Sequence, residues 1–235
     1  MSWQDLAALP QVERAHTLAC IDNPPGGSLI GNACWGGVLF SQIMDRISLS
    51  PGATRAKLCG WDGYATAVDL DWLLRPDTLL ATQMNGRPLS LEHGFPARIL
   101  IPGLYGQKMP KWLQRIEFIA YDFKGHWESQ GSPDAAILRP YIRVDVPVGS
   151  TAPGDRVELS GVALAGLDEA LAVDVRIDGG PWIPAEVERR SMHEWARWSL
   201  IWRPDQPGWY QFEARARTGS GEASGIHQAI VQVLA

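Results

Sequence analysis

The stretch Leu171-Ala-Val-Asp-Val-Arg-Ile177 alternates strictly along its length. Its branched aliphatic residues all share one parity, whereas the aspartate and the arginine fall on the other. A period of two predicts a β-strand with one buried and one solvated face. The following Asp178-Gly179-Gly180 predicts a tight turn, because glycine and aspartate favour turns over continued strand.

The same alternation recurs further along the chain, at residues 197–203 and 210–217. Successive runs of this kind, separated by turns, predict an antiparallel β-sandwich of about 100 residues. We assign it to residues 139–235. The late stretch Gly219-Ser-Gly-Glu-Ala-Ser-Gly225 has the wrong spacing for a dinucleotide-binding loop and follows a predicted strand. It is therefore interpreted as a hairpin turn.

Residues 1–138 have a mixed pattern. Ser2 and Asp5 predict a capping box that begins a short helix over Trp3–Ala8. Apolar residues spaced by four from Val38 onward predict an amphipathic helix that ends near Pro51. Strands are expected at residues 15–19, 57–59, 64–68, 79–84, 98–101 and 114–120, with a helical turn at 71–74. The predicted fold class is α+β: a mixed domain over 1–138, then the sandwich over 139–235.

Composition narrows the class of protein. The 235 residues are 46% hydrophobic and 20% charged, which is typical of a globular chain. A net charge of −5 argues against a nucleic-acid partner. No apolar run approaches the length of a membrane span, and the first residues lack the pattern of a signal peptide. The three cysteines form neither a disulfide framework nor a C-x-x-C-H haem motif.

Cys20 closes an apolar run and opens directly onto Asp22-Asn-Pro-Pro-Gly-Gly27. From the residues alone, two interpretations stay open. The thiol is a small core side chain, or a rigid strand end presents it to a group that binds sulfur. The spacing of His16, His126, His193 and His227 does not suggest a metal cluster.

Several segments occur together in one order: the cysteine stretch Thr17–Gly37, then His93-Gly-Phe-Pro-Ala-Arg98, then Lys111-Trp112, then Asp122-Phe-Lys-Gly-His-Trp127. In combination they resemble the sulfite oxidase family of molybdopterin-dependent oxidoreductases. The resemblance runs through most of the chain. It implies a sulfite-oxidase-type molybdopterin-binding domain followed by an immunoglobulin-like dimerisation domain.

The resemblance assigns a role to Cys20: it implies that this thiolate is the only protein ligand to molybdenum, beside two sulfurs of the pterin. A soft thiolate suits such a sulfur-rich centre, and a bound cation keeps the thiol deprotonated. The other residues that the resemblance places at the molybdenum cofactor are Asn23, Asp62, Tyr64, His93, Arg98, Lys108 and Lys111.

The resemblance also implies a function. The expected reaction is two-electron oxygen-atom transfer on a small oxo-substrate, with a separate electron carrier and with a homodimer formed through the sandwich. The parent protein is expected to work in the periplasm or elsewhere outside the cytoplasm.

Two departures from the family pattern bear on the substrate. Where sulfite oxidases follow the metal cysteine with arginines, this chain has Ile21–Pro25, and Asp22 would repel a dianion. Phe123 stands in place of the tyrosine of the family's Asp-Tyr-Lys-Gly motif. Both argue against sulfite. Family members also carry a segment before the position of Ser2, which suggests an alternative: a cofactor-free scaffold or dimerisation module derived from that family.

Overall fold

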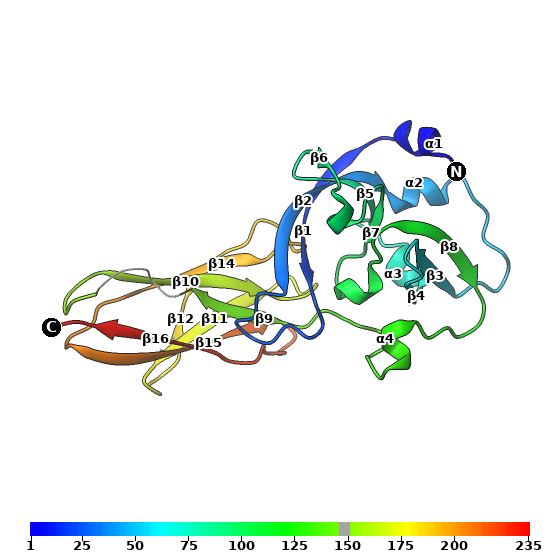
Figure 1. Ribbon diagram of the computed structural model, residues 1–235. Coiled ribbons are helices and arrows are strands. Elements are labelled where there is room, and N and C mark those ends of the chain that lie inside the picture. The colour runs from blue at the N-terminus through cyan, green and yellow to red at the C-terminus, as the bar shows by residue number, and fades with distance from the viewer. Residues whose placement is uncertain (146–150) are drawn as a thin grey trace. The chain divides into compact units, whose positions relative to one another are not determined.

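The structure, a computed structural model, describes residues 1–145 and 151–235, which form two compact units (Figure 1). The first unit contains Met1–Ile21 and Gly31–Leu138, and the second contains Asp22–Ile30 and Arg139–Ala235. The sequence pattern predicted only one division, after residue 138. It did not anticipate that the nine residues after Ile21 belong with the second unit.

The segment Asp22–Ile30 is bound to the second unit through its main chain. The Gly26 N–H donates to the Ile142 carbonyl at 3.0 Å, and the Tyr141 hydroxyl donates to the Gly27 carbonyl at 2.6 Å. Gly26 has a φ of +76°, and a Cβ there would lie 1.9 Å from the His227 ring. Glycine is required at this turn both for its backbone conformation and for close packing.

The first unit is mostly β-strand, and its helices are short. Its strands form one sheet of order β1-β2-β5-β6, in which β5 also pairs with β7, and a second sheet of order β4-β3-β8. The elements are α1 (Trp3–Ala7), β1 (Val12–Ala19), β2 (Ile30–Leu39), α2 (Phe40–Met44), β3 (Arg55–Gly60), β4 (Ala65–Asp69), α3 (Leu70–Leu73), β5 (Leu79–Met84), β6 (Arg87–Pro88), the 3-10 turn η1 (Leu91–His93), β7 (Arg98–Leu100), the 3-10 turn η2 (Gly106–Lys108), β8 (Leu113–Ile119) and α4 (His126–Ser129).

One hydrophobic core joins both sheets of this unit. Leu58 on β3, Leu79 on β5 and Phe40 at the start of α2 are at most 1% exposed, and all three belong to it. Burying each such side chain contributes roughly 1.5–3 kcal/mol. The predicted capping box is confirmed: the Asp5 N–H donates to the Ser2 hydroxyl, and the Ser2 N–H donates to the Asp5 carboxylate.

The prediction of a long amphipathic helix from Val38 is wrong. Val38 and Leu39 end strand β2, and the helix α2 that follows has only five residues. Strand pairing overrides the helical spacing here, because Leu39 lies opposite Leu79 on β5. Gly37 permits this pairing, since a Cβ there would lie 2.1 Å from the Leu80 carbonyl oxygen. The α+β prediction therefore overstated the helix content.

The second unit consists of two antiparallel four-stranded sheets, of order β13-β14-β10-β9 and β12-β11-β15-β16. Residues of both sheets share one hydrophobic cluster, which includes Leu159, Val175, Trp198 and Phe212. Its strands are β9 (Tyr141–Asp145), β10 (Val157–Leu164), β11 (Leu171–Ile177), β12 (Ile183–Pro184), β13 (Glu186–Glu188), β14 (Ala196–Trp202), β15 (Gly208–Thr218) and β16 (His227–Val233).

The alternation of β11 is confirmed: Val173 and Val175 are each 1% exposed in the core. Asp174, on the other parity, is also buried, which the pattern did not predict. The Arg215 Nε lies 3.0 Å from its carboxylate, and the Arg217 Nη2 lies 2.9 Å from it. The turn predicted at residues 219–225 joins β15 to β16.

Candidate functional site

Cys20 follows directly on Ala19, the last residue of β1. It is exposed and free, whereas Cys34 is half-buried and Cys59 is buried. The structure thus excludes the first of the two interpretations of this thiol: it is not a core side chain. The rigid strand β1 ends immediately before it.

Arg98, at the start of β7, is a buried cation without a carboxylate partner among the residues that the structure describes. Its Nη1 donates to the His93 carbonyl at 3.3 Å and its Nη2 to the Met109 carbonyl at 3.2 Å. Its Nε is buried with no partner in the described chain. Burial lowers the pKa of Arg98 to about 10. A guanidinium in this position favours an anion beside it.

The His93 loop and the Lys111 loop lie side by side. The Ser90 hydroxyl caps η1 by accepting the His93 N–H at 3.3 Å. Gly94 has a φ of +105°, and a Cβ there would lie 2.9 Å from the Lys111 Cβ. The Lys111 ammonium donates to the Glu92 carbonyl at 3.0 Å. His93, Arg98 and Lys111 are therefore brought together, as the sequence predicted for one site.

The turn between β3 and β4 borders the Lys111 loop, since the Trp61 N–H donates to the Trp112 carbonyl at 2.9 Å. Asp62 is exposed on this turn and accepts the Tyr64 N–H at 3.1 Å. The Tyr64 hydroxyl donates to the Gln107 carbonyl at 2.5 Å. Burial, with Glu128 and Asp62 nearby, raises the pKa of Tyr64, so its hydroxyl stays protonated.

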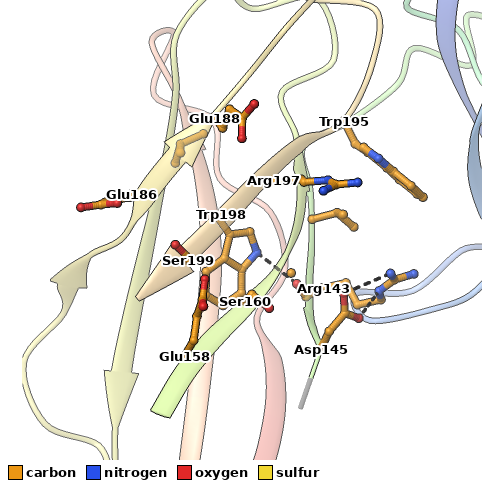
Figure 2. Close-up of a pocket in the computed structure, with 13 residues that line it drawn as sticks. Arg143, Asp145, Glu158, Ser160, Glu186, Glu188, Trp195, Arg197, Trp198 and Ser199 are labelled. Carbon is orange, nitrogen blue, oxygen red and sulfur yellow. Dashed lines mark hydrogen bonds and ion pairs between the residues drawn. The ribbon is translucent and has the colours of Figure 1, made fainter. Parts of the chain in front are cut away.

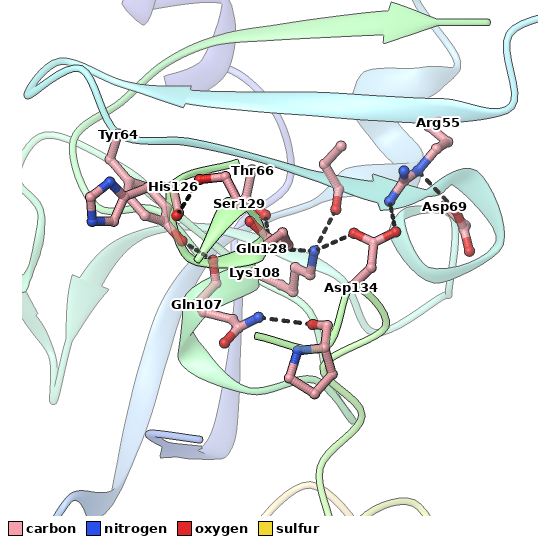
Figure 3. A network of polar contacts seen from close by, with 12 residues as sticks. Arg55, Tyr64, Thr66, Asp69, Gln107, Lys108, His126, Glu128, Ser129 and Asp134 are labelled. Carbon is pink, nitrogen blue, oxygen red and sulfur yellow. Dashed lines mark hydrogen bonds and ion pairs between the residues drawn. The ribbon is translucent and has the colours of Figure 1, made fainter. Parts of the chain in front are cut away.

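The Lys108 side chain does not join His93, Arg98 and Lys111; it points into a buried polar network (Figure 3). Its ammonium donates to Glu128 Oε1 at 2.6 Å, to the Ala67 carbonyl at 2.9 Å and to Asp134 Oδ1 at 3.2 Å. These bonds account for all three ammonium hydrogens. Nothing in the sequence pattern indicated Glu128 or Asp134 as its partners.

Asn23 lies on the segment that belongs to the second unit. Its side-chain oxygen accepts the Leu29 N–H at 2.8 Å and so holds the loop after Cys20. His93, Arg98 and Lys111 belong to the first unit, so the role of Asn23 beside them stays a prediction.

A recess of about 670 Å³ lies on the second unit over the outer face of the sheet β13-β14-β10-β9. Figure 2 shows Glu158, Glu186 and Glu188 around it, together with Arg143 and Arg197. The Arg143 guanidinium pairs with Asp145 at 2.7 Å and lies 5.8 Å from the ring centroid of Trp195. This face is polar and carries both signs of charge.

Comparison with known proteins identifies the family to which the first unit belongs. Residues 1–127 match the family described as oxidoreductase molybdopterin binding domain. The uncharacterized oxidoreductase YuiH of Bacillus subtilis is 35% identical over 131 residues, which cover 56% of this chain and 64% of that protein. Mitochondrial sulfite oxidase of Rattus norvegicus is 28% identical over 249 residues, covering 86% of this chain and 45% of that protein.

A solved structure, the sulfane dehydrogenase SoxCD from Paracoccus pantotrophus, aligns over 100% of this chain and 74% of its own with a TM-score of 0.82. At 19% identity this likeness concerns the fold. The chain spans about half the length of the curated relatives that it matches.

The family match over residues 1–127 thus identifies the first unit as a molybdopterin-binding oxidoreductase domain. The chain belongs to the sulfite oxidase family of molybdopterin oxidoreductases, whose cofactor is the molybdenum cofactor. Among the described residues, no three His, Cys, Asp or Glu side chains gather in a way that could hold a metal ion. Helices of the described chain all fall short of the length and apolarity needed to cross a membrane.

Proposed function

We propose that the first unit binds the molybdenum cofactor and uses it for oxygen-atom transfer on a small substrate. The observation that carries this proposal is Arg98, a buried guanidinium with an unpartnered Nε and only carbonyl partners in the described chain. Such a group fits an anion, and the cofactor carries a phosphate. Arginine can hold a phosphate through two parallel hydrogen bonds.

Cys20 is the proposed metal ligand. It is exposed at the end of a rigid strand, and a thiolate is the ligand that a sulfur-rich metal centre prefers. When bound, the cofactor supplies the two-electron change and the exchange of an oxygen atom. The chain supplies a fixed ligand, orientation and charge.

Three further residues are proposed to line this site. Lys111 uses one ammonium hydrogen on the Glu92 carbonyl, which leaves other hydrogens available for an anionic ligand. His93 is exposed beside it, and Asp62 lies on the adjoining turn. Tyr64 contributes by fixing the Gln107 carbonyl. Asn23 shapes the loop that follows Cys20.

The proposed substrate is a small oxo-compound other than sulfite. Asp22 is exposed two residues after Cys20 and would repel a dianion. Phe123 has no hydroxyl to offer, and its ring lies 4.5 Å from the Lys57 ammonium. We also propose that a separate electron carrier exchanges electrons with the site, as the family resemblance implies.

The test is the molybdenum and pterin content of the chain, purified from a host that makes the cofactor. We expect close to one molybdenum per chain, a loss of at least about tenfold in Cys20→Ala, and no change in the matched control Cys34→Ala. If the intact chain carried no metal, the alternative of a cofactor-free scaffold would replace this proposal.

We further propose that the second unit is an immunoglobulin-like domain. In chain order, its strands one, two, five and six form one sheet, and strands three, four, seven and eight form the other. This is the division between the ABED and C′CFG sheets of such domains.

We propose that this unit forms a homodimer through the sheet face shown in Figure 2. A two-fold axis brings each surface patch of one copy against the same patch of the other. Glutamates of one copy, on β13 and β10, can therefore pair with arginines of the other, on β14 and β9.

A further inference from the structure

Lys108 and Glu128 form an ion pair that is buried inside the first unit. Both side chains are 1% exposed, and their charged atoms lie 2.6 Å apart. Burying a charge is costly unless it is paired and hydrogen-bonded. The pair meets this condition at Glu128 Oε1, which also accepts the Thr66 hydroxyl at 2.8 Å, whereas Glu128 Oε2 is buried with no partner among the described residues.

The pair is the centre of a network that fixes four elements. Lys108 ends η2, Thr66 and Ala67 lie on β4, and Glu128 lies on α4. Asp134 extends the network to β3, because its Oδ2 lies 2.8 Å from the Arg55 Nη2 (Figure 3).

The turn η2 depends on these tertiary contacts for its position. It has three residues, and 3-10 turns of this length have little stability of their own. Lys108 anchors its end in the network, and the Tyr64 hydroxyl binds its Gln107 carbonyl.

The turn lies directly behind the backbone that presents Cys20. A Cβ added at Gly106 would lie 3.5 Å from the Ala19 carbonyl oxygen. A second series of contacts links Lys108 to strand β1. The carbonyl of Met109, the residue after Lys108, accepts a hydrogen bond from Arg98. Arg98 in turn lies 5.3 Å from the ring of Trp35, whose indole N–H donates to the His16 carbonyl of β1.

We infer that Lys108 and Glu128 form a positioning pair for Cys20. Their contact holds η2 against the end of β1, so it sets where the thiol stands, and Lys108 itself makes no contact with the cofactor. The inference rests on the proposed function only in taking Cys20 as the ligand that must be positioned.

The first experiment measures the Cys20 thiol itself. Each variant is treated with iodoacetamide, and the alkylation rate of the Cys20 peptide is followed by mass spectrometry. Lys108→Met should change this rate severalfold. The matched control Lys57→Met breaks a 3.7 Å ion pair with Glu117 on the sheet of β3 and should leave the rate as it is.

A double variant separates positioning from stability. Lys108→Met leaves Glu128 buried and unpaired, and should lower the melting temperature by roughly 10 °C. Lys108→Met with Glu128→Leu removes both charges and should recover much of that loss. If the Cys20 rate stays changed in the double variant, the pair positions the thiol. If the rate returns to wild type together with the melting temperature, or never changed, the inference is overturned.

The cofactor-loaded chain provides a second readout. The double variant should retain severalfold less molybdenum than the wild type at equal folded fraction. Full retention would contradict the inference. If even the wild type holds no molybdenum, the proposed function fails, whereas the alkylation rates still decide whether the pair positions Cys20.

Discussion

The Arg98 guanidinium lies 5.3 Å from the centroid of the Trp35 ring. Trp35 is on β2, which pairs with β1, the strand that leads to Cys20. The Trp35 indole N–H donates to the His16 carbonyl at 3.3 Å, which joins this pair to β1. The indole face attracts a cation and so orients the guanidinium. Arg98 is thereby held in a fixed direction although no carboxylate of the described chain pairs with it.

Arg98→Met should impair cofactor binding far more than folding. The substitution removes two hydrogen bonds to carbonyls, but it also removes a buried unpaired charge. These effects oppose each other, and the free energy of unfolding should change by about 1 kcal/mol. Molybdenum content should fall at least about tenfold, because the anion loses its charged donor. Urea unfolding of the cofactor-free chain and metal analysis of the loaded chain measure the two quantities.

The matched control is Arg46→Met, which removes the same charge from an exposed position after α2. It should leave both quantities near wild type. Full molybdenum content in Arg98→Met would show that Arg98 is not the anion-binding group.

Gly161→Ala should destabilise the second unit. A Cβ at Gly161 would lie 1.9 Å from the Arg143 carbonyl oxygen and 2.9 Å from the Trp198 Nε1. The Trp198 indole now donates to that carbonyl at 3.1 Å, so the strands must separate and the hydrogen bond must lengthen. Overpacking of this kind costs about 1–3 kcal/mol, measurable by urea unfolding followed through tryptophan fluorescence.

Gly31→Ala is the comparison for this variant, because a Cβ at Gly31 meets no atom within 4 Å. Its effect should stay within about 0.5 kcal/mol. Equal effects of the two substitutions would mean that the loss comes from strand propensity and not from the close contact of β10 with β9.

Sequence patterns correctly predicted the strands and turns whose conformation is determined by the residues within them. Leu79–Met84 is a strand as predicted, and the Asn85-Gly86 turn follows with φ of 52° and 72°. The prediction of a long helix from Val38 was wrong because the apolar residues spaced by four span the end of strand β2 and the short helix α2. Pairing between β2 and β5 is a tertiary contact, and one stretch of sequence does not reveal it.

In the candidate site, too, some features could be predicted from the sequence and others could not. The family motifs predicted that His93, Arg98 and Lys111 belong together, and their loops lie together in the structure. The direction of the Lys108 side chain could not be predicted, because its partner Glu128 is 20 residues away and its burial results from the packing of three elements. Motif position indicates a loop, but packing decides where a long side chain points.

Arg197→Glu should weaken the proposed dimer. It replaces a positive charge on the face shown in Figure 2 by a negative one, so that glutamates of the two copies would meet. Like charges at an interface raise the dissociation constant, and the effect should diminish in high salt. Sedimentation equilibrium measures it. Arg156→Glu, at an exposed position before β10 that does not line this recess, is the control. A monomeric wild type, or an unchanged dimer in Arg197→Glu, would contradict the proposal.

The second unit should lose stability as the solution becomes acidic, because of His227. Its Nδ1 accepts the Val144 N–H at 2.9 Å, which requires a neutral ring. Burial lowers the pKa of His227, while Asp145 acts in the opposite direction and Arg143 in the same one. As the pH falls below about 6.5, the unfolded chain takes up this proton before the folded chain does. Stability therefore decreases until the pH passes the folded-state pKa, and this histidine contributes no further change below it.

His227→Gln removes the titration but can still offer an acceptor to Val144. Its melting temperature should depend less on pH than that of the wild type between about pH 7.5 and pH 5. Differential scanning fluorimetry across that range measures both slopes. If His227→Gln and the wild type lose stability in parallel, the acid sensitivity of this unit has another origin.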